Sequence, residues 1–342
     1  MQDRSLATAA PSRWALVIAL GTVYFIWGST YLAIRIAIET IPPFLMLGTR
    51  FVLAGAVLYG WMRWRGVPAP SVKQWRTAAL IGGLMLCAGT GTVGWAEQYI
   101  PSGLAALLIT TVPLWMVLLD WLWQRGQRPN AVVFFGLLLG LAGVGVLVDP
   151  LAVLATYTVD VFVASMVLLG ALAWSVGSLY GRRVDLPTNP FMSTALQMVA
   201  GGALLTLTGL LLGESAAFDV TAFSLRSFAS WSYLVFFGAI LAFSAYVWLL
   251  RNTSPAQATT YAYVNPVVAV FLGWALMDEP LNARILLAVG LLITAVVLIN
   301  RYGQPARSKT PSGAASLRPI RPGRAIRSRR TRTSRPVLPR PD

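Results

Sequence analysis

The sequence predicts an all-α integral membrane protein with ten transmembrane helices arranged as two inverted five-helix repeats. Of the 342 residues, 56% are hydrophobic and only 11% are charged, whereas a soluble domain carries about 25% charged residues. The apolar residues fall into ten runs of the length that crosses a membrane, about 20 residues. The second half of the chain echoes the first, and an odd number of spans per copy forces the second copy to enter the membrane from the opposite side.

Each expected helix is an apolar run that ends at charged residues, Pro or Gly. The runs cover residues 14–38, 44–62, 77–99, 102–123, 131–148, 161–181, 191–212, 230–250, 256–277 and 284–300. The first run lacks the cleavage pattern of a signal peptide, so we expect it to remain as a membrane anchor. The chain then divides into a first repeat, 14–148, and a second repeat, 161–300.

Basic residues alternate between the expected loops, as the positive-inside rule requires. One side receives Arg4, Arg13, Arg63, Arg65, Lys73, Arg76, Arg125, Arg128, Arg182, Arg183, Arg251 and the C-terminal tail. The other side receives only Arg226 and Arg284. We therefore expect the first side to be cytoplasmic, with a cytoplasmic N-terminus, 1–13, and a cytoplasmic tail, 303–342.

The net charge of +15 is concentrated in this tail. Residues 303–342 hold eleven of the 27 Lys and Arg residues and a single acid, Asp342. The tail is rich in Pro, Ser and Arg and lacks apolar periodicity, which predicts disorder. We interpret it as a solvated topology anchor, with binding to anionic lipid head groups as the alternative. No nucleic-acid partner is expected.

Missing residue types narrow the possible chemistry. The chain has no His and one cysteine, Cys87, which excludes His-based proton relays, Ser-His catalysis and disulfide frameworks. Neither a P-loop nor a Gly-x-Ser-x-Gly nucleophile turn occurs. We expect no enzyme, no metal, no cofactor and no direct use of ATP.

Two sequence echoes support the internal repeat. Gly28-Ser29-Thr30-Tyr31 matches Gly177-Ser178-Leu179-Tyr180, and Pro113 matches Pro266, each proline following a helix start rich in small residues. Inverted repeats of this kind are typical of secondary transporters, whose substrate site lies near the membrane midplane where the halves meet.

Several short motifs in both halves carry a family resemblance. They are Trp27-Gly28-Ser29-Thr30-Tyr31, Gly48-Thr49-Arg50-Phe51, Pro101-Ser102-Gly103-Leu104-Ala105-Ala106, Ser178-Leu179-Tyr180-Gly181-Arg182, Arg251-Asn252-Thr253-Ser254-Pro255-Ala256 and Tyr263-Val264-Asn265-Pro266-Val267-Val268. Over residues 14–300 the chain resembles the drug/metabolite transporter superfamily, and more narrowly a two-repeat EamA-domain protein of the YedA-like branch. The resemblance implies a ten-helix exporter of the bacterial inner membrane with a cavity lined by both repeats. Members move amino acids, nucleobase-like metabolites or drugs, so the resemblance names no substrate.

An aromatic stripe on the first span is a candidate cavity wall. Tyr24, Trp27, Tyr31 and Arg35 follow one another at steps of 3, 4 and 4, which predicts one helical face. Trp27 falls near the bilayer centre, although Trp and Tyr are usually found at membrane interfaces. We expect Tyr24, Trp27 and Tyr31 to bind flat or amphipathic solutes, with aromatic packing between helices as the alternative.

The ninth span holds the strongest site candidate. Gln257, Tyr261 and Asn265 lie at i, i+4 and i+8. Pro266 frees a backbone carbonyl one turn earlier, and Pro113 does the same in the fourth span. Interrupted segments at equivalent positions of both halves indicate a transporter site, and simple helix kinking is the alternative. Further substrate-binding candidates are Thr111, Trp174, Ser178 and Tyr246.

Three charged residues within or near the spans are gating or coupling candidates, because a charge inside the membrane costs about 3 kcal/mol or more. We expect Glu97 to pair with Arg50 or Arg35 when an outer gate is shut. Protonation of Glu97 or binding of substrate would then change this pairing. In the alternative, Arg35 reaches toward Glu39 and Glu97 is hydrated.

The sequence therefore predicts a secondary transporter that exports small metabolites, amino acids or drugs across the bacterial inner membrane. A carrier or flippase for an amphipathic or lipid-linked molecule is the alternative, and an intramembrane enzyme is disfavoured. The expected partners are a small-molecule substrate, the lipid bilayer and, as a coupling ion, protons. The substrate, the energy coupling and the oligomeric state are left open.

Overall fold

The computed structural model of the chain describes residues 12–100, 102–123, 128–148, 160–217, 219, 224–277 and 282–302, which form helices and no strand. The helices are α1 Arg13–Ala37, α2 Pro43–Trp64, α3 Val72–Gly82, η1 Gly83–Thr90, α4 Gly91–Ala96, α5 Ser102–Ile109, α6 Val112–Leu122, α7 Ala131–Val148, α9 Val161–Gly181, α10 Pro190–Leu211, α11 Glu214–Ala217, α12 Leu225–Tyr233, η3 Leu234–Phe243, α13 Ser244–Asn252, α14 Pro255–Ala258, α15 Tyr261–Met277 and α16 Ala283–Tyr302. The expected tail, all but two residues of the expected N-terminal segment, and the side chain of Tyr31 lie outside the described part.

The all-helical prediction is confirmed for the described residues. Eight helical segments are long and apolar enough to cross a membrane, and they match eight of the ten expected spans. The fourth and ninth expected spans each form two shorter helices, α5–α6 and α14–α15. The count of ten crossings therefore stays a prediction for these two spans. Large apolar side chains such as Phe25, Leu169 and Leu207 are exposed along the long helices, as a lipid-facing surface requires.

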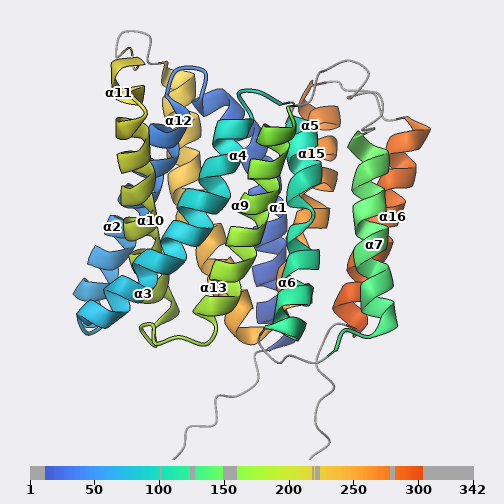
Figure 1. Cartoon of the computed structure of the whole chain (residues 1–342), viewed down its shortest axis with the longest axis horizontal. Helices are drawn as coiled ribbons and strands as arrows, with labels where there is room; N and C mark the ends of the chain where they lie inside the picture. Colours follow the sequence, from blue (N-terminus) through green and yellow to red (C-terminus); the bar gives the residue numbers. More distant parts are fainter. Residues whose placement is uncertain are drawn as a thin grey trace, which may run out of the picture. The chain divides into compact units, whose positions relative to one another are not determined.

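The two halves of the bundle run in opposite directions. In Figure 1, α1 rises through the bundle from its lower end, whereas α9 descends from its upper end. The second helices of the two halves, α2 and α10, pack along each other, and so do α7 and α16. The first helix of each half packs against the third and fourth helices of the other half: α1 contacts α12, η3, α13 and α15, and α9 contacts η1, α4, α5 and α6. The main packing surface is therefore the one between the halves.

Glycines allow α2 and α10 to touch backbone to backbone. A Cβ added at Gly48 of α2 would lie 2.6 Å from the backbone nitrogen of Thr206. A Cβ added at Gly202 of α10 would lie 2.7 Å from the backbone nitrogen of Val52. Small residues at a helix crossing permit this close approach. Each helix therefore offers a glycine to the other.

The same irregularities occur in both halves. The third helix of each half contains a π-helical segment, η1 or η3. The fourth helix of each half is interrupted at a pair of threonines, Thr110-Thr111 and Thr259-Thr260. All four hydroxyls donate to backbone carbonyls three or four residues earlier, at 2.5 to 2.8 Å. Such bonds compete with the helical pattern, and here they coincide with the interruptions in both halves.

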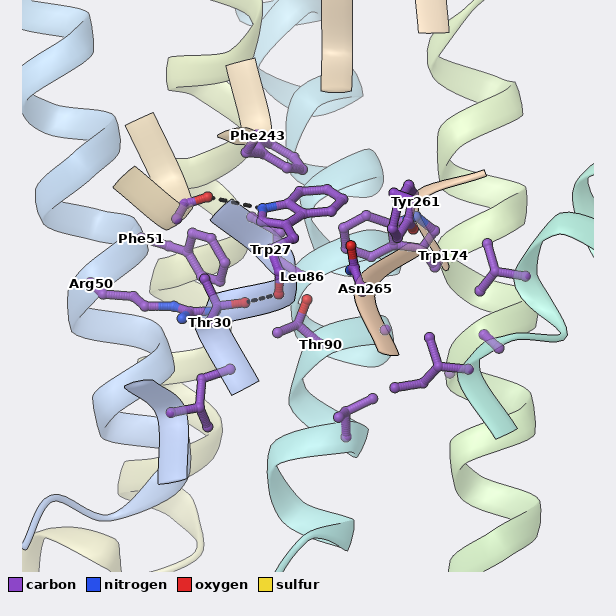
Figure 2. Close-up of a pocket in the computed structure, with 18 residues that line it drawn as sticks. Trp27, Thr30, Arg50, Phe51, Leu86, Thr90, Trp174, Phe243, Tyr261 and Asn265 are labelled. Atoms are coloured by element: carbon purple, nitrogen blue, oxygen red, sulfur yellow. Dashed lines mark hydrogen bonds between the residues drawn. The ribbon is translucent and has the colours of Figure 1, made fainter. Parts of the chain in front are cut away.

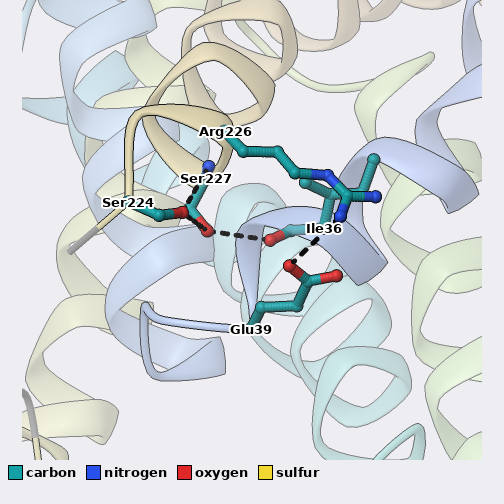
Figure 3. Close-up of polar contacts among 5 residues, drawn as sticks. All are labelled: Ile36, Glu39, Ser224, Arg226 and Ser227. Carbon is teal, nitrogen blue, oxygen red and sulfur yellow. Dashed lines mark hydrogen bonds and ion pairs between the residues drawn. The ribbon is translucent and has the colours of Figure 1, made fainter. Parts of the chain in front are cut away.

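The C-terminal end of α1 is tied to the start of α12 (Figure 3). Ser227 Oγ donates a hydrogen bond to the carbonyl of Ile36 at 3.0 Å, and Arg226 lies 3.9 Å from a carboxylate oxygen of Glu39. The ion pair is exposed and contributes little to stability. Glu39 thus pairs with Arg226, not with Arg35 as the alternative prediction had it.

Candidate functional site

A cavity of about 130 Å³ lies where the two halves meet. The first half contributes residues of α1, α2, η1, α4, α5 and α6 to its wall, and the second half contributes residues of α9, η3 and α15. On α1 the lining residues are Trp27, Thr30 and Ile34, so the cavity lies in the half of α1 nearer its C-terminus. Figure 2 shows the labelled side chains that surround this space.

Each half places a tryptophan of its first helix against the π-helical segment of the other half. Trp27 Nε1 donates to the carbonyl of Gly238 in η3 at 3.1 Å. Trp174 of α9 covers Gly89 of η1, where an added Cβ would lie 3.1 Å from the indole ring. Both glycines line the cavity. The missing side chain of Gly89 leaves room for the indole of Trp174, whereas an added Cβ at Gly238 would face Thr30. π-Helical segments are frequent at functional sites.

An aromatic cluster closes the cavity on the side nearer the N-terminus of α1. Trp27 contacts Trp174, Tyr246 and Tyr261 with ring centroids 4.8 to 5.8 Å apart. Such pairs contribute about 0.5–1.5 kcal/mol each. Tyr246 is fully buried. Its hydroxyl accepts a hydrogen bond from Trp174 Nε1 at 3.1 Å and shares another with Ser178 Oγ at 3.0 Å. These contacts join the members of the cluster to one another, and we call the cluster of Trp27, Trp174, Tyr246 and Tyr261 the floor of the cavity.

The interrupted ninth span adds polar contacts to this floor. The Tyr24 hydroxyl lies 2.5 Å from Thr260 Oγ1. With its carboxamide nitrogen turned toward the nearby acceptors, Asn265 donates to the carbonyls of Tyr261 at 3.0 Å and Tyr24 at 3.3 Å. The contacts of Tyr24 with Thr260 and Asn265 join α1 of the first half to the interrupted ninth span of the second.

Arg50 is the one charged side chain among the described residues that line the cavity. Only 6% of it is exposed. Its guanidinium carbon lies 4.5 Å from the ring centroid of Phe51, and its Nε has no hydrogen-bond partner. Neither ion pair found among the described residues involves it. In Figure 2 the side chain extends from α2 toward Thr30.

The structure brings some of the predicted site residues to the cavity and leaves others beside it. The cavity is lined by Trp27, Trp174, Tyr261, Asn265 and Arg50. Tyr246 belongs to the floor, Ser178 is hydrogen-bonded to it, and Tyr24 is hydrogen-bonded to Thr260. Thr111 and Gln257 are not among the lining residues. The Thr111 hydroxyl donates to the carbonyl of Leu108 at 2.7 Å, and Gln257 is buried in α14.

The face of α1 that meets the cavity differs from the predicted stripe. The lining residues advance from Trp27 to Thr30 and Ile34, whereas Arg35 is exposed. Two consecutive steps of four residues turn a helix by about 80° away from the starting face, since each residue turns it by about 100°. Arg35 therefore does not share the face of α1 that lines the cavity.

The ninth span breaks earlier than predicted. Pro113 is the second residue of α6 and follows the first interruption directly, but Pro266 lies inside α15. The second interruption falls at Thr259-Thr260 instead. It separates Gln257 from the helix of Tyr261 and Asn265, so these three residues do not share one helical face. Threonine hydroxyl bonding, rather than proline, marks this break.

The predicted pairing of Glu97 with Arg50 or Arg35 is not present among the described ion pairs. Glu97 follows the last residue of α4, just past the candidate span Val72–Ala96. Burial raises the pKa of its carboxyl to about 7, and the charge of Arg35 lowers it in part. A gate-dependent pairing of Glu97 stays a prediction.

Sequence reasoning missed several lining residues. Thr30, Phe51, Phe243, Gly89 and Gly238 all line the cavity. Thr30 and Phe51 stand inside motifs that carried the family resemblance, which was the available signal. The two glycines were not distinguishable from packing glycines, because nothing in the sequence marked the π-helical segments that present them.

Comparisons with known proteins agree with this architecture. Residues 13–148 and 161–301 each match the EamA-like transporter family. The chain is 41% identical over 293 residues to the inner membrane transporter YedA of Escherichia coli (strain K12), covering 84% of this chain and 92% of YedA. It is 24% identical to the transporter YvbV of Bacillus subtilis (strain 168), over 89% of this chain and 95% of YvbV.

A solved crystal structure shows the same fold. It superimposes with a TM-score of 0.69 at 21% sequence identity, covering 85% of this chain and 98% of the other. The family and these relatives are transporters rather than enzymes. Two family matches, one on each half, agree with the occurrence of the irregular segments in pairs. The chain belongs to the EamA-like transporter family, within the drug/metabolite transporter superfamily.

Proposed function

We propose that this protein is a secondary transporter that exports small metabolites, amino acids or drugs by alternating access, with the cavity between the two repeats as its substrate site. The observation that carries the proposal is a cavity wall shared by both repeats. When one repeat rocks against the other, such a cavity changes the side to which it opens.

The position of the cavity supports an outward state. It lies in the C-terminal half of α1, and the aromatic floor separates it from the N-terminal half. The proposed cytoplasmic location of both termini puts the C-terminal half of α1 on the periplasmic side. In the reverse state the floor contacts between α1 and α15 would open, and the cavity would close on the periplasmic side. Glu97 is the proposed proton-coupling group.

Transport by purified protein in liposomes tests this proposal. We would add a mixed pool of metabolites and read their movement by mass spectrometry, with and without a pH gradient. We expect selective movement of some solutes, and a loss of at least tenfold for Trp27→Ala. Trp64→Ala is the matched control, because Trp64 lies at the end of α2 and is 81% exposed.

Two results would contradict the proposal. If the Trp27→Ala variant moves solutes as fast as the wild type, the cavity is not on the transport path. Scrambling of lipids without movement of any soluble compound would favour a lipid carrier instead. An export rate that does not change with the pH gradient would be consistent with alternating access but would exclude protons as the coupling ion.

A further inference from the structure

We propose that the cavity selects small organic anions, with a carboxylate held by Arg50 and an apolar or aromatic body held against Trp27 and Tyr261. This inference rests on the proposed function, because it names the substrate class of the same site. It begins from a feature that packing does not explain: a buried guanidinium that faces an internal cavity and has no acidic partner among the described residues.

The burial of Arg50 is unfavourable unless a negative charge joins it. The residue lies seven positions past the first residue of α2, Pro43, which corresponds to about 10 Å along the helix. A buried charge is normally paired, and a charged residue inside a membrane marks a substrate or ion pathway in many transporters. Phe51 offers its ring face to the guanidinium at 4.5 Å, but a ring leaves the N–H donors of the guanidinium without acceptors.

The unmet hydrogen bonds fit a carboxylate. A guanidinium has five N–H donors in one plane and binds a carboxylate through two parallel bonds. The Nε–H of Arg50 has no partner and no surface open to the cavity in this state, so we assign the contact with the carboxylate to the terminal NH₂ groups. The neighbouring Thr30 hydroxyl already donates to the carbonyl of Trp27 at 2.7 Å, so it does not compete with Arg50 as a donor to the ligand. Arg50 is therefore the main anchor for a negative group.

The rest of the cavity suits an apolar body of limited size. A volume of about 130 Å³ has room for about ten water positions, and so for a solute of about ten non-hydrogen atoms. Trp27, Trp174, Phe243 and Tyr261 supply aromatic surface. The described lining contains no Asp or Glu, so an ammonium group would meet no opposite charge there.

Three probes of nearly equal size test the charge preference. They are phenylacetate, its neutral isostere phenylacetamide, and 2-phenylethylammonium. Binding of each to the purified full-length protein would be measured by isothermal titration calorimetry. We expect phenylacetate to bind at least tenfold more tightly than the other two, because a hydrogen bond between charged groups is worth that factor or more.

Variants of Arg50 identify the source of the preference. Arg50→Met should weaken phenylacetate binding by about 10- to 100-fold and leave phenylacetamide binding unchanged, and Arg50→Lys should keep part of the preference. Arg226→Gln, which removes an exposed charge at the start of α12, is the matched control and should bind all three probes as the wild type does. Arg50→Met should also unfold at the same or a higher temperature, because it removes an unpaired buried charge.

Several outcomes would overturn the inference. These are equal affinity for the three probes, preference for the amide or the amine, or failure of phenylacetate, 3-phenylpropionate and hexanoate all to bind. A lower unfolding temperature of Arg50→Met with equal loss of acid and amide binding would show a purely structural role. If the liposomes still move solutes in these cases, only the anion inference fails; if they move none, the proposed function fails as well.

Discussion

Tyr246 of α13 contacts residues of three other helices, α1, α9 and α15, in the floor of the cavity. Its hydroxyl is the partner of both Trp174 Nε1 and Ser178 Oγ, and its ring packs against Trp27 and Tyr261. A buried donor without a partner costs about 1–3 kcal/mol. This one oxygen therefore supports the position of Trp174 at the cavity edge.

Replacing this oxygen should weaken the fold and disturb the site. We expect Tyr246→Phe to destabilise the protein by about 1–3 kcal/mol, since Trp174 Nε1 then lacks its acceptor. Thermal unfolding in detergent measures the change. Tyr99→Phe, at an exposed tyrosine, is the control and should unfold as the wild type does. An unfolding temperature of Tyr246→Phe equal to that of the control would contradict the assigned network.

We expect the stability of the protein to depend on pH through the carboxyl of Glu97. Burial raises its pKa from 4.5 to about 7, so between these values the folded protein binds a proton that the unfolded chain has released. Stability should therefore fall as the pH rises from about 5 to 7. Glu97→Gln should reduce this slope, as read from unfolding temperatures across that range. An identical slope in the variant would assign the pH dependence to another group.

At the scale of elements, the two halves meet through helices that approach each other closely at glycines. Gly28 of α1 faces α15, where an added Cβ would lie 2.6 Å from Cβ of Val268. The same pair of helices carries the bonds between Tyr24, Thr260 and Asn265. Close approach at Gly28 thus holds Trp27 beside Tyr261.

A single methyl group at this crossing should separate the helices. We expect Gly28→Ala to destabilise the protein by about 1–3 kcal/mol, because a fixed core must shift to admit it. Gly21→Ala lies in the same helix with nothing within 4 Å of its added Cβ, and it should be neutral or stabilising by up to about 1 kcal/mol. Equal effects of the two substitutions, measured by thermal unfolding, would refute the close contact.

At the scale of the whole molecule, the interrupted spans decide how often the chain crosses the membrane. Eight segments are long enough to do so alone, and α5–α6 and α14–α15 supply the remaining two crossings only if both helices of each pair continue in one direction. The proposed orientation requires this for both termini and the basic loops to share one side.

Labelling from one side of the membrane tests the fourth crossing. In a Cys87→Ser background, Gln98→Cys precedes α5 and Arg128→Cys follows α6; both positions are exposed. A membrane-impermeant maleimide added from the periplasm should label Gln98→Cys and not Arg128→Cys. Trp64→Cys, at the end of α2, should behave like Arg128→Cys. Labelling of both test positions from the periplasm would show that α5–α6 turns back.

The helices and the family could be predicted because long apolar runs and alternating basic loops are properties of the sequence itself. The site could be predicted only in part. Trp27, Tyr261 and Asn265 stood out as polar or aromatic residues in apolar helices, and the structure brings them to one cavity. Thr259-Thr260 did not stand out, because hydroxyl-to-carbonyl bonding becomes a helix break only where packing favours it. Gly89 and Gly238 depend on π-helical segments that no periodicity reveals.

The reciprocal glycine contact between α2 and α10 has a consequence for the transport cycle. Gly48 lies against the backbone of α10 and Gly202 lies against the backbone of α2. In the proposed alternating-access cycle, this contact would act as a pivot to which each repeat contributes one half. A bulkier residue at either position would raise the free energy of both end states of the proposed cycle by a similar amount. Turnover would slow while the balance between the two end states stayed the same, whereas a change in the aromatic floor would tip that balance toward one side.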